Sequence, residues 1–365
     1  MILIVDDHQQ VADGLAEALS ATGYGVVVCY DVESAEIVVR NANVSAIVCD
    51  IRLSGPFRFE GLDFLDYVRR HAPRAQVALI SGNVTADIRA ESLRRGADLI
   101  LAKPFSIDDL EPLLRGSRNG AHGTTRVPTL DEILATEAVR TRFQPIIRLA
   151  DRTTIGYETL AGLSIDSFLG RPDLLFAYAE RKQRIFDLEL ACMRHALIAA
   201  KSFASRRLFM NLHPAVLADA ARFADAVIAA AEDNRFPLAC IVLELTEQGA
   251  VHWNDEVERT VENLQARGVR FAFDDVGMAY SHLAVIERFR PAYLKVSQQF
   301  GTGFEADTTR LKLVRNLLSL ANDFEAELIL EGIETQATAD AARAEGIPLG
   351  QGFHLARPMG AEQLS

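Results

Sequence analysis

Short apolar runs alternate with amphipathic patterns along most of the chain. In residues 1–115, five apolar runs predict β-strands, and the stretches between them place apolar residues three and four positions apart, which predicts helices. The predicted strands are Ile2–Val5, Gly25–Cys29, Ala46–Cys49, Gln76–Ile80 and Leu99–Ala102. This alternation favours an α/β domain with a doubly wound, five-stranded parallel sheet that helices cover on both faces.

Residues 116–128 interrupt the alternation, because they have little apolar content and are rich in Gly, Ser, Thr and Arg. This composition is typical of a linker. The alternation then resumes, and residues 129–365 contain eight predicted strands: Thr141–Ile147, Thr154–Leu160, Arg207–Leu212, Ala239–Leu245, Arg270–Phe273, Tyr293–Val296, Glu327–Leu330 and Gly350–Phe353. Eight units over this length predict a second domain, a TIM-like (β/α)₈ barrel.

Composition narrows the range of partners. The chain has 365 residues, of which 49% are hydrophobic, and both predicted domains share its net charge of −12. A DNA-binding protein has a basic surface, so we expect no DNA partner. The four cysteines lack CxxC spacing, which favours free thiols in a reducing cytosol. No stretch reaches the roughly 20 apolar residues of a membrane span, and no leader precedes Asp6, so we expect a cytoplasmic protein without a membrane partner.

Polar side chains follow four of the predicted strands in residues 1–115. They are Asp6, Asp7, Asp50, Ser81 and Lys103. The carboxyl ends of parallel strands meet at one edge of a sheet, so we expect these groups to lie together. Three carboxylates there repel one another unless a divalent cation binds. A lysine and a hydroxyl beside them suit an acyl phosphate, because they can neutralise and hydrogen-bond its oxygens.

On these residues, the whole of residues 1–115 resembles a response-regulator receiver domain. The resemblance implies that a cognate histidine kinase phosphorylates Asp50. It also implies that Asp6, Asp7 and Asp50 bind one Mg²⁺ or Mn²⁺ ion. Ser81 and Lys103 would then be the residues that contact the phosphoryl group.

Polar residues at the carboxyl ends of barrel strands are typical of an active site. Seven of the predicted barrel strands end in an acid, an amide or a lysine: Glu158, Asn211, Glu244, Asp274 and Asp275, Lys295, Glu331, and Gln351. Five carboxylates around one cavity need cations, and oxygen ligands without His or Cys favour Mg²⁺ or Mn²⁺ over Zn²⁺. Two such ions serve in-line displacement at phosphorus, which predicts metal-assisted phosphodiester hydrolysis.

This ordered set resembles an EAL-type cyclic-di-GMP phosphodiesterase domain over residues 129–365, with the family's triplet present as Glu158-Thr159-Leu160. The resemblance implies hydrolysis of cyclic-di-GMP to linear pGpG with two Mg²⁺ or Mn²⁺ ions. The implied ligands of the first ion are Glu158, Asn211, Glu244 and Asp274. Asp274 would bridge to the second ion, which Asp275 would also bind.

The same resemblance assigns further roles. The implied catalytic residues are Glu158, Asp275, Lys295 and Glu331. Lys295 and Glu331 would position the attacking water and stabilise charge. Gln351 and Leu160 would contact the substrate, and Glu247 would anchor the loop after the aspartate pair.

Some positions depart from the two families. Ile100 stands where receiver domains usually have an aromatic residue that takes part in the output switch. Gly162 stands where EAL domains have an arginine that contacts the substrate phosphate, so substrate binding should be weaker. Ser297 replaces a frequent aspartate, and Ala279 replaces a glycine in the loop Val276–Ala279. An alanine is strained there if the position needs a positive φ.

Three functions are compatible with these residues. The first is a two-component response regulator whose phosphorylation at Asp50 controls cyclic-di-GMP hydrolysis, with a homodimer as the expected assembly. The second is a weak or inactive EAL domain that acts as a cyclic-di-GMP-binding or protein-interaction effector. The third is a dimerisation scaffold, which the retained carboxylates disfavour. The activity level, the sign of the regulation and the kinase stay open.

Overall fold

A computed structural model describes residues 1–53, 59–115, 123–136, 138–164, 167–246, 254–277 and 283–364. The chain forms two compact units. The first comprises Met1–Ala138 and Leu163–Arg184, and the second comprises Val139–Gly162 and Ile185–Ser365. Residues 163–184 therefore pack within the first unit, although a barrel hairpin precedes them in the sequence. A single boundary at a linker does not describe this interleaving.

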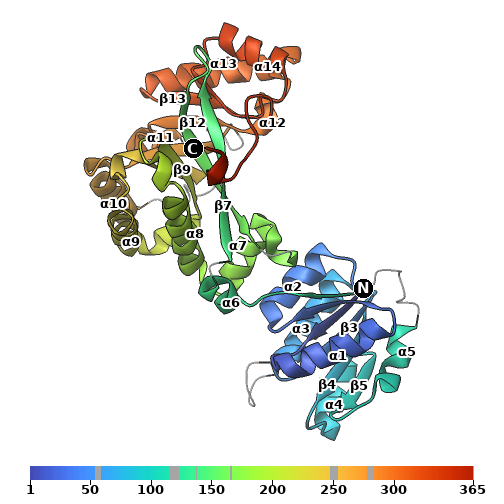
Figure 1. The fold of residues 1–365 in the computed structure, drawn as a ribbon. Coiled ribbons are helices and arrows are strands. Elements are labelled where there is room, and N and C mark those ends of the chain that lie inside the picture. Colours follow the sequence, from blue (N-terminus) through green and yellow to red (C-terminus); the bar gives the residue numbers. More distant parts are fainter. Residues whose placement is uncertain are drawn as a thin grey trace. The chain divides into compact units, whose positions relative to one another are not determined.

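The first unit contains a six-stranded sheet in the order β5-β4-β3-β1-β2-β6, and all of its strand pairs are parallel (Figure 1). The strands are β1 (Ile2–Val5), β2 (Gly25–Cys29), β3 (Ala46–Asp50), β4 (Gln76–Ser81), β5 (Leu99–Ala102) and β6 (Gly123–Arg126). The first five occupy the predicted positions, so the predicted doubly wound parallel sheet is confirmed.

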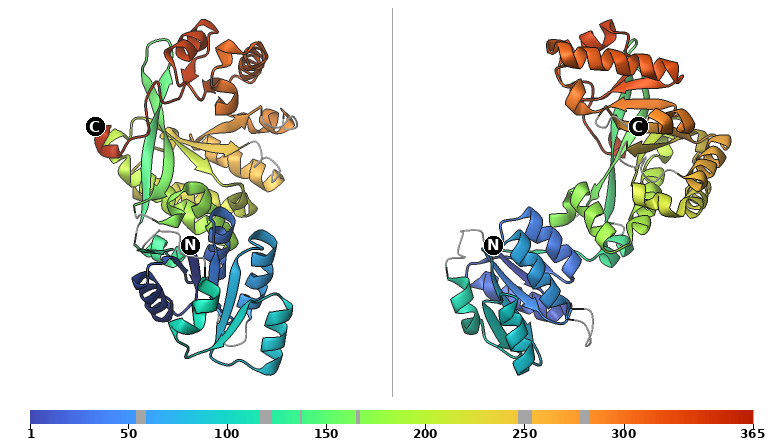
Figure 2. Two further views of the ribbon diagram at one scale, coloured as in Figure 1. Left: turned by 90° about the vertical axis from the view of Figure 1, so that its right-hand side faces the viewer. Right: turned by 180° about the vertical axis from the view of Figure 1, so that it is seen from behind.

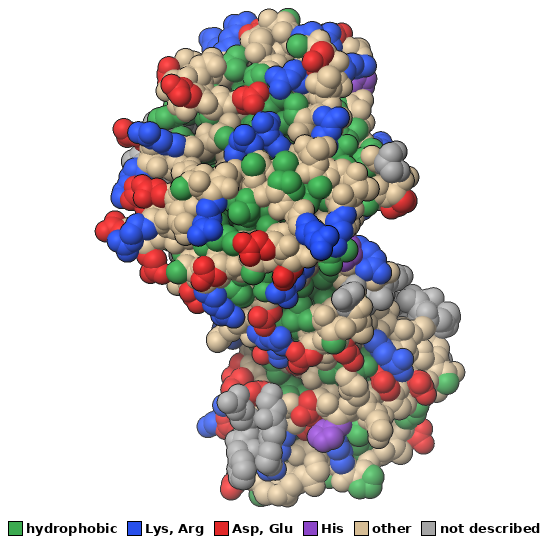
Figure 3. Space-filling model, turned by 60° about the vertical axis from the view of Figure 1, so that its left-hand side comes forward, with side chains coloured by type: hydrophobic (Ala, Val, Ile, Leu, Met, Phe, Trp, Pro, Cys, Tyr) green, Lys and Arg blue, Asp and Glu red, His purple; other side chains and the backbone are tan. Residues whose placement is uncertain are grey.

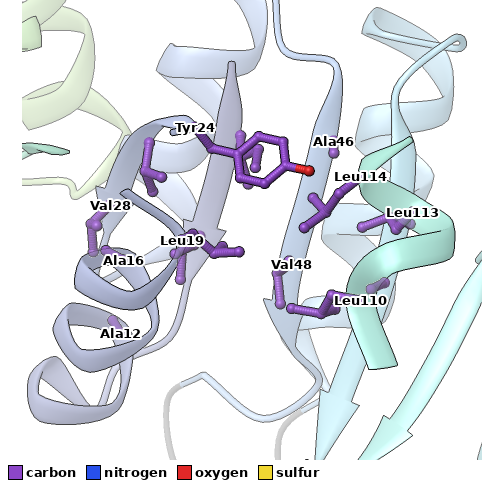
Figure 4. Close-up of a cluster of buried hydrophobic side chains, with 14 of the residues drawn as sticks. Ala12, Ala16, Leu19, Tyr24, Val28, Ala46, Val48, Leu110, Leu113 and Leu114 are labelled. Carbon is purple, nitrogen blue, oxygen red and sulfur yellow. The ribbon is translucent and has the colours of Figure 1, made fainter. Parts of the chain in front are cut away.

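Five helices belong to this sheet: α1 (Gln9–Ala21), α2 (Val32–Asn41), α3 (Glu60–His71), α4 (Ala86–Arg94) and α5 (Glu111–Leu114). On one face, Leu19 of α1 and Leu114 of α5 pack with Val48 in the core that Figure 4 shows. The alternate strand residues Leu3 and Ile47 point to the other face and are also fully buried. Both faces are therefore covered, which explains the uninterrupted apolar runs of these strands.

The structure corrects part of the predicted linker. Gly123–Arg126 form strand β6, which pairs in parallel with β2, for example Val26 with Thr124. An edge strand such as β2 presents unpaired backbone groups, and a short extended segment can satisfy them. Val127 follows β6 and is buried, which anchors the segment. Residues 116–122 of the predicted linker lie outside the described residues.

Two further helices of the first unit lie beyond β6: α6 (Leu130–Ala135) and α7 (Pro172–Arg181). The hydroxyl of Tyr178, a buried residue, donates a hydrogen bond to Asp31 (2.6 Å) and accepts one from the Leu130 amide (3.3 Å). Asp31 also caps α2 by accepting from the Ser34 amide. Lys182 lies 3.5 Å from Asp31. These contacts fix α6 and α7 to the start of α2.

The second unit is a closed eight-stranded barrel, which confirms the TIM-like fold class. Its strands are β7 (Val139–Arg148), β8 (Thr154–Leu163), β9 (Arg207–Leu212), β10 (Ile241–Thr246), β11 (Arg270–Val276), β12 (Tyr293–Val296), β13 (Glu327–Leu330) and β14 (Leu349–Gly350). One strand departs from a (β/α)₈ pattern, because β7 is antiparallel to β14. Residues 149–153 join β7 directly to β8, and this connection is too short for a helical crossover.

Helices surround the barrel, and the views of Figure 2 show them outside the long green strands β7 and β8. They are α8 (Ile185–Ala199), α9 (Ala220–Asp233), α10 (Asp255–Ala266), α11 (Leu283–Phe289), α12 (Gln298–Gly301), α13 (Thr308–Asp323) and α14 (Gln336–Ala344). Short 3₁₀ turns occur in both units. They lie at Ile107–Leu110 and Phe168–Gly170 in the first unit, and at Lys201–Phe203, Pro214–Asp219, Leu238–Cys240, Phe304–Ala306 and Ala361–Gln363 in the second.

The barrel interior contains a layer of packed apolar side chains. The buried members are Ile146, Phe209, Val242, Ala272, Tyr293, Ile329 and Leu349. The rings of Phe209 and Tyr293 lie 4.9 Å apart at their centres. Because side chains two positions apart in a strand share a face, the residue two positions after each member other than Ile146 points into the barrel on the carboxyl side of this layer. Ile146 is the exception because β7 runs in the opposite direction. This rule places the predicted site residues above a solid apolar floor.

The surface is mixed in charge. On the face that Figure 3 shows, basic and acidic side chains are interspersed with apolar ones. Among the helices of the described residues, none combines the length and the apolar character needed to cross a membrane.

Two glycines of the first unit make contrasting predictions for stability. A Cβ atom on Gly61 would lie 2.2 Å from the Asp50 carbonyl oxygen, whereas one on Gly14 in α1 would meet nothing within 4 Å. We expect Gly61→Ala to destabilise the chain by about 1–3 kcal/mol, because α3 must move away from β3. Gly14→Ala should stabilise it by about 0.5–1 kcal/mol, because alanine favours a helix. Denaturant unfolding measures both, and equal effects of the two changes would contradict the close α3–β3 approach.

Candidate active site

The barrel brings the predicted residues of its carboxyl end together. Glu158 lies in β8, Asn211 in β9, Glu244 in β10, Asp274 and Asp275 in β11, and Lys295 in β12, while Glu331 and Gln351 directly follow β13 and β14. The register aligns Glu244 with Asn211 and Thr246 with Asp274, so these strands end at the same level. The inward-facing member of each strand end therefore points into one cavity.

Lys295 is the centre of this cluster. The lysine is fully buried, and its Nζ atom lies 3.0–3.5 Å from four carboxylates. These belong to Glu158, Glu244, Asp274 and Glu331. Burial would lower the pKa of Lys295, but the four carboxylates hold it well above the usual value. The ammonium group is therefore a permanent positive charge inside the barrel.

One lysine cannot compensate four carboxylates, and the pKa values reflect this. Burial, with the charges of Glu158 and Asp274, raises the pKa of Glu244 well above its usual value. Burial likewise raises the pKa of Asp274, and it raises that of Glu331 to about 7. Without added cations, burial and mutual repulsion therefore disfavour the charged forms of these acids.

Glu158 is the exception among the four. Burial alone would raise its pKa, but Lys295, Gln351 and Asn211 together lower it. The Gln351 side-chain amide donates to Oε2 of Glu158 (2.6 Å), and the Asn211 amide donates to Oε1 (3.1 Å). Both oxygens of this carboxylate are thus oriented by amides from neighbouring strands.

The donor set suits divalent cations. Asp274, Asp275 and Glu331 each offer an oxygen, and these atoms all lie within 4.8 Å of one another. Oε1 of Glu244 is buried and accepts no hydrogen bond, although Lys295 lies 3.1 Å away. Carboxylate and amide oxygens without His or Cys favour Mg²⁺ or Mn²⁺. The residues present therefore fit hard cations.

The backbone at the aspartate pair is unusual. Asp275 has φ of 58°, and the register between β11 and β12 shifts between Phe273 and Val276. A residue of this type in the left-handed region is uncommon, and such local irregularities re-aim side chains near active sites. Asp275 is exposed, whereas Asp274 is largely buried, so both can approach the cavity from one strand.

A cavity of about 300 Å³ opens above the cluster, and Leu160, Glu158, Asp275, Glu331 and Gln351 are among its lining residues. Six other described lining residues were not predicted as site residues: Gln144, Gln298, Gly332, Glu334, Gly352 and Phe353. All of them except Gln144, which lies in β7, follow a predicted site residue by one to three positions. Closeness in sequence to a predicted site residue was the signal that could have identified these, but not Gln144.

Several predicted features lie outside the described residues. These are the predicted loop anchor Glu247 and most of the altered loop after the aspartate pair, Met278–Ser281. The described part of that loop includes Gly277, whose φ of 104° requires glycine. Ser297 is buried, and Gly162 has open space where a Cβ atom would lie.

The receiver edge also gathers its predicted residues. Nζ of Lys103 lies 2.6 Å from both Asp6 and Asp50. Burial would lower the pKa of Lys103, but its hydrogen bonds with Asp50 and Asp6 raise it. Asp7 faces His8, and an oxygen of each aspartate of the pair lies within 4.8 Å of the His8 ring nitrogen. Ser81 is buried at the end of β4, where its hydroxyl accepts a hydrogen bond from the Asn83 amide.

The fold and the site together define a class: a doubly wound α/β domain followed in the chain by a TIM-like barrel with an acidic, lysine-centred cavity. Residues 129–358 match the family model of the EAL domain, and residues 2–115 match that of the response regulator receiver domain. The chain therefore belongs to the EAL domain family and carries an N-terminal receiver domain.

Known proteins match different lengths of this chain. The chain is 23% identical over 350 residues to the cyclic di-GMP phosphodiesterase RocR of Pseudomonas aeruginosa, covering 90% of this chain and 87% of RocR. It is 26% identical over 113 residues to the cyclic di-GMP phosphodiesterase TpdA of Vibrio parahaemolyticus, covering 31% of this chain and only 20% of TpdA. A solved structure of the PaMucR phosphodiesterase in complex with c-di-GMP matches with a TM-score of 0.60 and 26% identity, covering 65% of this chain and 98% of that one.

The pKa of Glu331 predicts how stability depends on pH. The unfolded glutamate loses its proton near 4.5, whereas the folded one keeps it up to about 7. The folded state binds more protons in this window, so the metal-free chain should lose up to about 3 kcal/mol of stability from this group as pH rises through it. Burial also raises the pKa of Glu189 to about 8. Ionisation of Glu189 should therefore also lower the stability of the folded chain as pH rises. Denaturant unfolding in EDTA at a series of pH values measures the total.

Two variants separate these contributions. Glu331→Gln should flatten the pH dependence and also reduce the stabilisation that added Mn²⁺ gives at pH 8, because Glu331 is a candidate metal-site group. Glu189→Gln should flatten the pH dependence but leave the Mn²⁺ effect unchanged, because Glu189 lies in α8 and bonds to the His213 amide. A metal-free chain that gains stability as pH rises would refute the raised pKa values.

Proposed function

We propose that the chain is a response regulator that hydrolyses cyclic-di-GMP to linear pGpG in the barrel cavity. One observation carries the proposal: a buried lysine lies within 3.5 Å of four carboxylates at the carboxyl ends of barrel strands. Membership of the EAL family and similarity to RocR over 90% of this chain support cyclic-di-GMP as the substrate.

The proposed metal ligands are Glu158, Asn211, Glu244, Asp274 and Asp275. When bound, divalent cations would neutralise charge at phosphorus and lower the pKa of the attacking water. Gln351 supports this arrangement, since its hydrogen bond orients the Glu158 carboxylate. Leu160 lines the same cavity and would give the substrate an apolar contact.

Two side chains would act on the reacting atoms. Glu331 lines the cavity and would accept a hydrogen bond from the attacking water. Lys295 would stabilise the negative charge that develops around phosphorus. The water oxygen forms a new bond to phosphorus while the bond from phosphorus to the ribose 3′-oxygen breaks. That oxygen leaves with a proton, which gives a linear dinucleotide with a 5′-phosphate.

The receiver would control this reaction through phosphorylation of Asp50 by a histidine kinase. The Lys103 ammonium group beside Asp50 suits the oxygens of a phosphoryl group. Residues 163–184 directly follow β8, the strand of Glu158, and pack in the same unit as α2. A change at α2 can therefore reach β8 through the covalent chain. We propose a homodimer as the assembly.

A second candidate is a cyclic-di-GMP-binding effector without turnover. Its support is the absence of arginine and lysine among the described residues that line the cavity. Gly162, at the end of β8, leaves open space where the family has a phosphate-binding arginine. Bound cations would then be the main contacts of the two phosphates of the substrate.

Turnover tests the first proposal directly. The purified chain with cyclic-di-GMP and Mg²⁺ or Mn²⁺ should form pGpG, measured by chromatography. Glu158→Gln should lower the rate by about 100-fold or more, because a group of this kind acts in the transition state. The matched control is Glu262→Gln on the exposed face of α10, which should keep the rate. Background turnover in the unaltered chain, combined with cyclic-di-GMP binding, would instead establish the effector.

Gly162→Arg tests the missing phosphate contact. The new guanidinium has room, and a charge-assisted contact should lower the Kd for cyclic-di-GMP by about tenfold. Calorimetry in EDTA measures this Kd without turnover. Gly170→Arg is the matched control, because Gly170 also has open space and does not line the cavity. Equal Kd values for both variants would show that Gly162 does not face the phosphates.

A further inference from the structure

A second cavity lies at the other end of the barrel. It has a volume of about 470 Å³, and the starts of β8, β9 and β11 line it together with the last residue of β7 and the 3₁₀ turn that precedes β10. Because β7 runs antiparallel, its last residue Arg148 lies at the amino ends of the other strands. This cavity is therefore separated from the carboxylate site by the apolar floor of the barrel.

Four arginines dominate the lining, and we call this cavity the arginine pocket: Arg148, Arg206, Arg207 and Arg270. Its other lining residues include Thr153, Thr154 and Ser205, and no Asp or Glu is among the described residues that line it. The excess of positive charge stands out, because the chain as a whole has a net charge of −12.

Three of the four guanidinium groups contact uncharged partners. Arg206 donates to the Thr154 carbonyl oxygen (2.8 Å), and Arg270 donates to the Ala239 carbonyl oxygen (2.8 Å). Arg207 lies over the Tyr293 ring, 5.7 Å from its centre. These contacts fix the side chains but leave their charges uncompensated.

Arg148 alone of the four has a carboxylate within 4 Å among the described residues. Its partner Glu327 lies 3.8 Å away, and both side chains are 40% exposed. Such a pair contributes little to stability. Close like charges repel, so an arrangement of four fixed guanidinium groups favours binding of an anion.

A purely structural role accounts for only part of the set. Arg207 covers Tyr293 and thus closes the apolar floor. Arg206 and Arg270 do not need to carry charge for that purpose, since they donate hydrogen bonds to backbone carbonyls that an amide could also satisfy. Their guanidinium groups retain free planar donors, which suit the paired oxygens of phosphate groups.

We propose that the arginine pocket binds a small polyanion with at least two phosphate groups, such as pyrophosphate or a nucleoside triphosphate. The pocket volume lies within the usual range for small-molecule sites. Two or more phosphates can engage several guanidinium groups at once, whereas a single phosphate reaches fewer. The site is independent of the cyclic-di-GMP reaction, because different residues at the opposite end of the barrel form it.

Calorimetry on the full chain tests the proposal. Pyrophosphate and ATP are titrated separately in EDTA, so that no divalent cation attracts them to the carboxylate cavity. We expect saturable binding of one ligand per chain that weakens as salt rises from about 50 to 150 mM. Arg206→Gln with Arg270→Gln should raise the Kd by about tenfold or more, since each removes a charge-assisted contact.

The controls locate the binding. Arg259→Gln with Lys312→Gln removes the same charge from exposed positions on α10 and α13, and this double variant should keep the original Kd. Glu158→Gln should also keep it, because it alters only the carboxylate cavity. The single variants Arg206→Gln and Arg270→Gln, checked by thermal unfolding, guard against misfolding of the pair. No binding by the unaltered chain, or equal losses in the pocket and control pairs, would overturn the proposal.

Discussion

Four carboxylates that share one buried lysine are the constraint on which the chemistry of the barrel depends. Lys295 supplies one positive charge to four acids within 3.5 Å. This leaves an excess of negative charge, and burial together with the neighbouring carboxylates raises the pKa values of Glu244, Asp274 and Glu331. Protons and divalent cations therefore compete for the same oxygens.

An apolar layer of side chains separates the acidic end of the barrel from its basic end. Phe209 and Tyr293 pack within that layer, and Asn211 and Lys295 follow them by two positions on the same face. On the opposite side, Arg207 lies over Tyr293. Acids at one end and arginines at the other are thus held by the same strands but cannot neutralise one another. The carboxylate cavity therefore keeps the negative charge that suits cations, and the arginine pocket keeps the positive charge that suits an anion.

Much of this organisation could be predicted from the sequence, because a buried parallel strand is an apolar run and its functional residue follows that run. Asp50 at the end of β3 and Lys295 near the end of β12 were found in this way. The features that were missed depend on partners distant in sequence. β6 forms because β2 has a free edge, and β7 reverses because only five residues join it to β8. The left-handed backbone of Asp275 likewise follows from the shifted pairing with β12, not from local residue types.

The two acidic sites use lysine in different ways, and the difference follows from burial. Lys103 bridges Asp6 and Asp50 with a side chain that is 23% exposed, so it can change partners at little cost. A phosphoryl group on Asp50 would add negative charge within its reach and draw it away from Asp6. Lys295 has no exposed surface, so it cannot leave its carboxylates. Lys103 is therefore free to change partners under the proposed phosphorylation of Asp50, whereas Lys295 stays in place among its carboxylates.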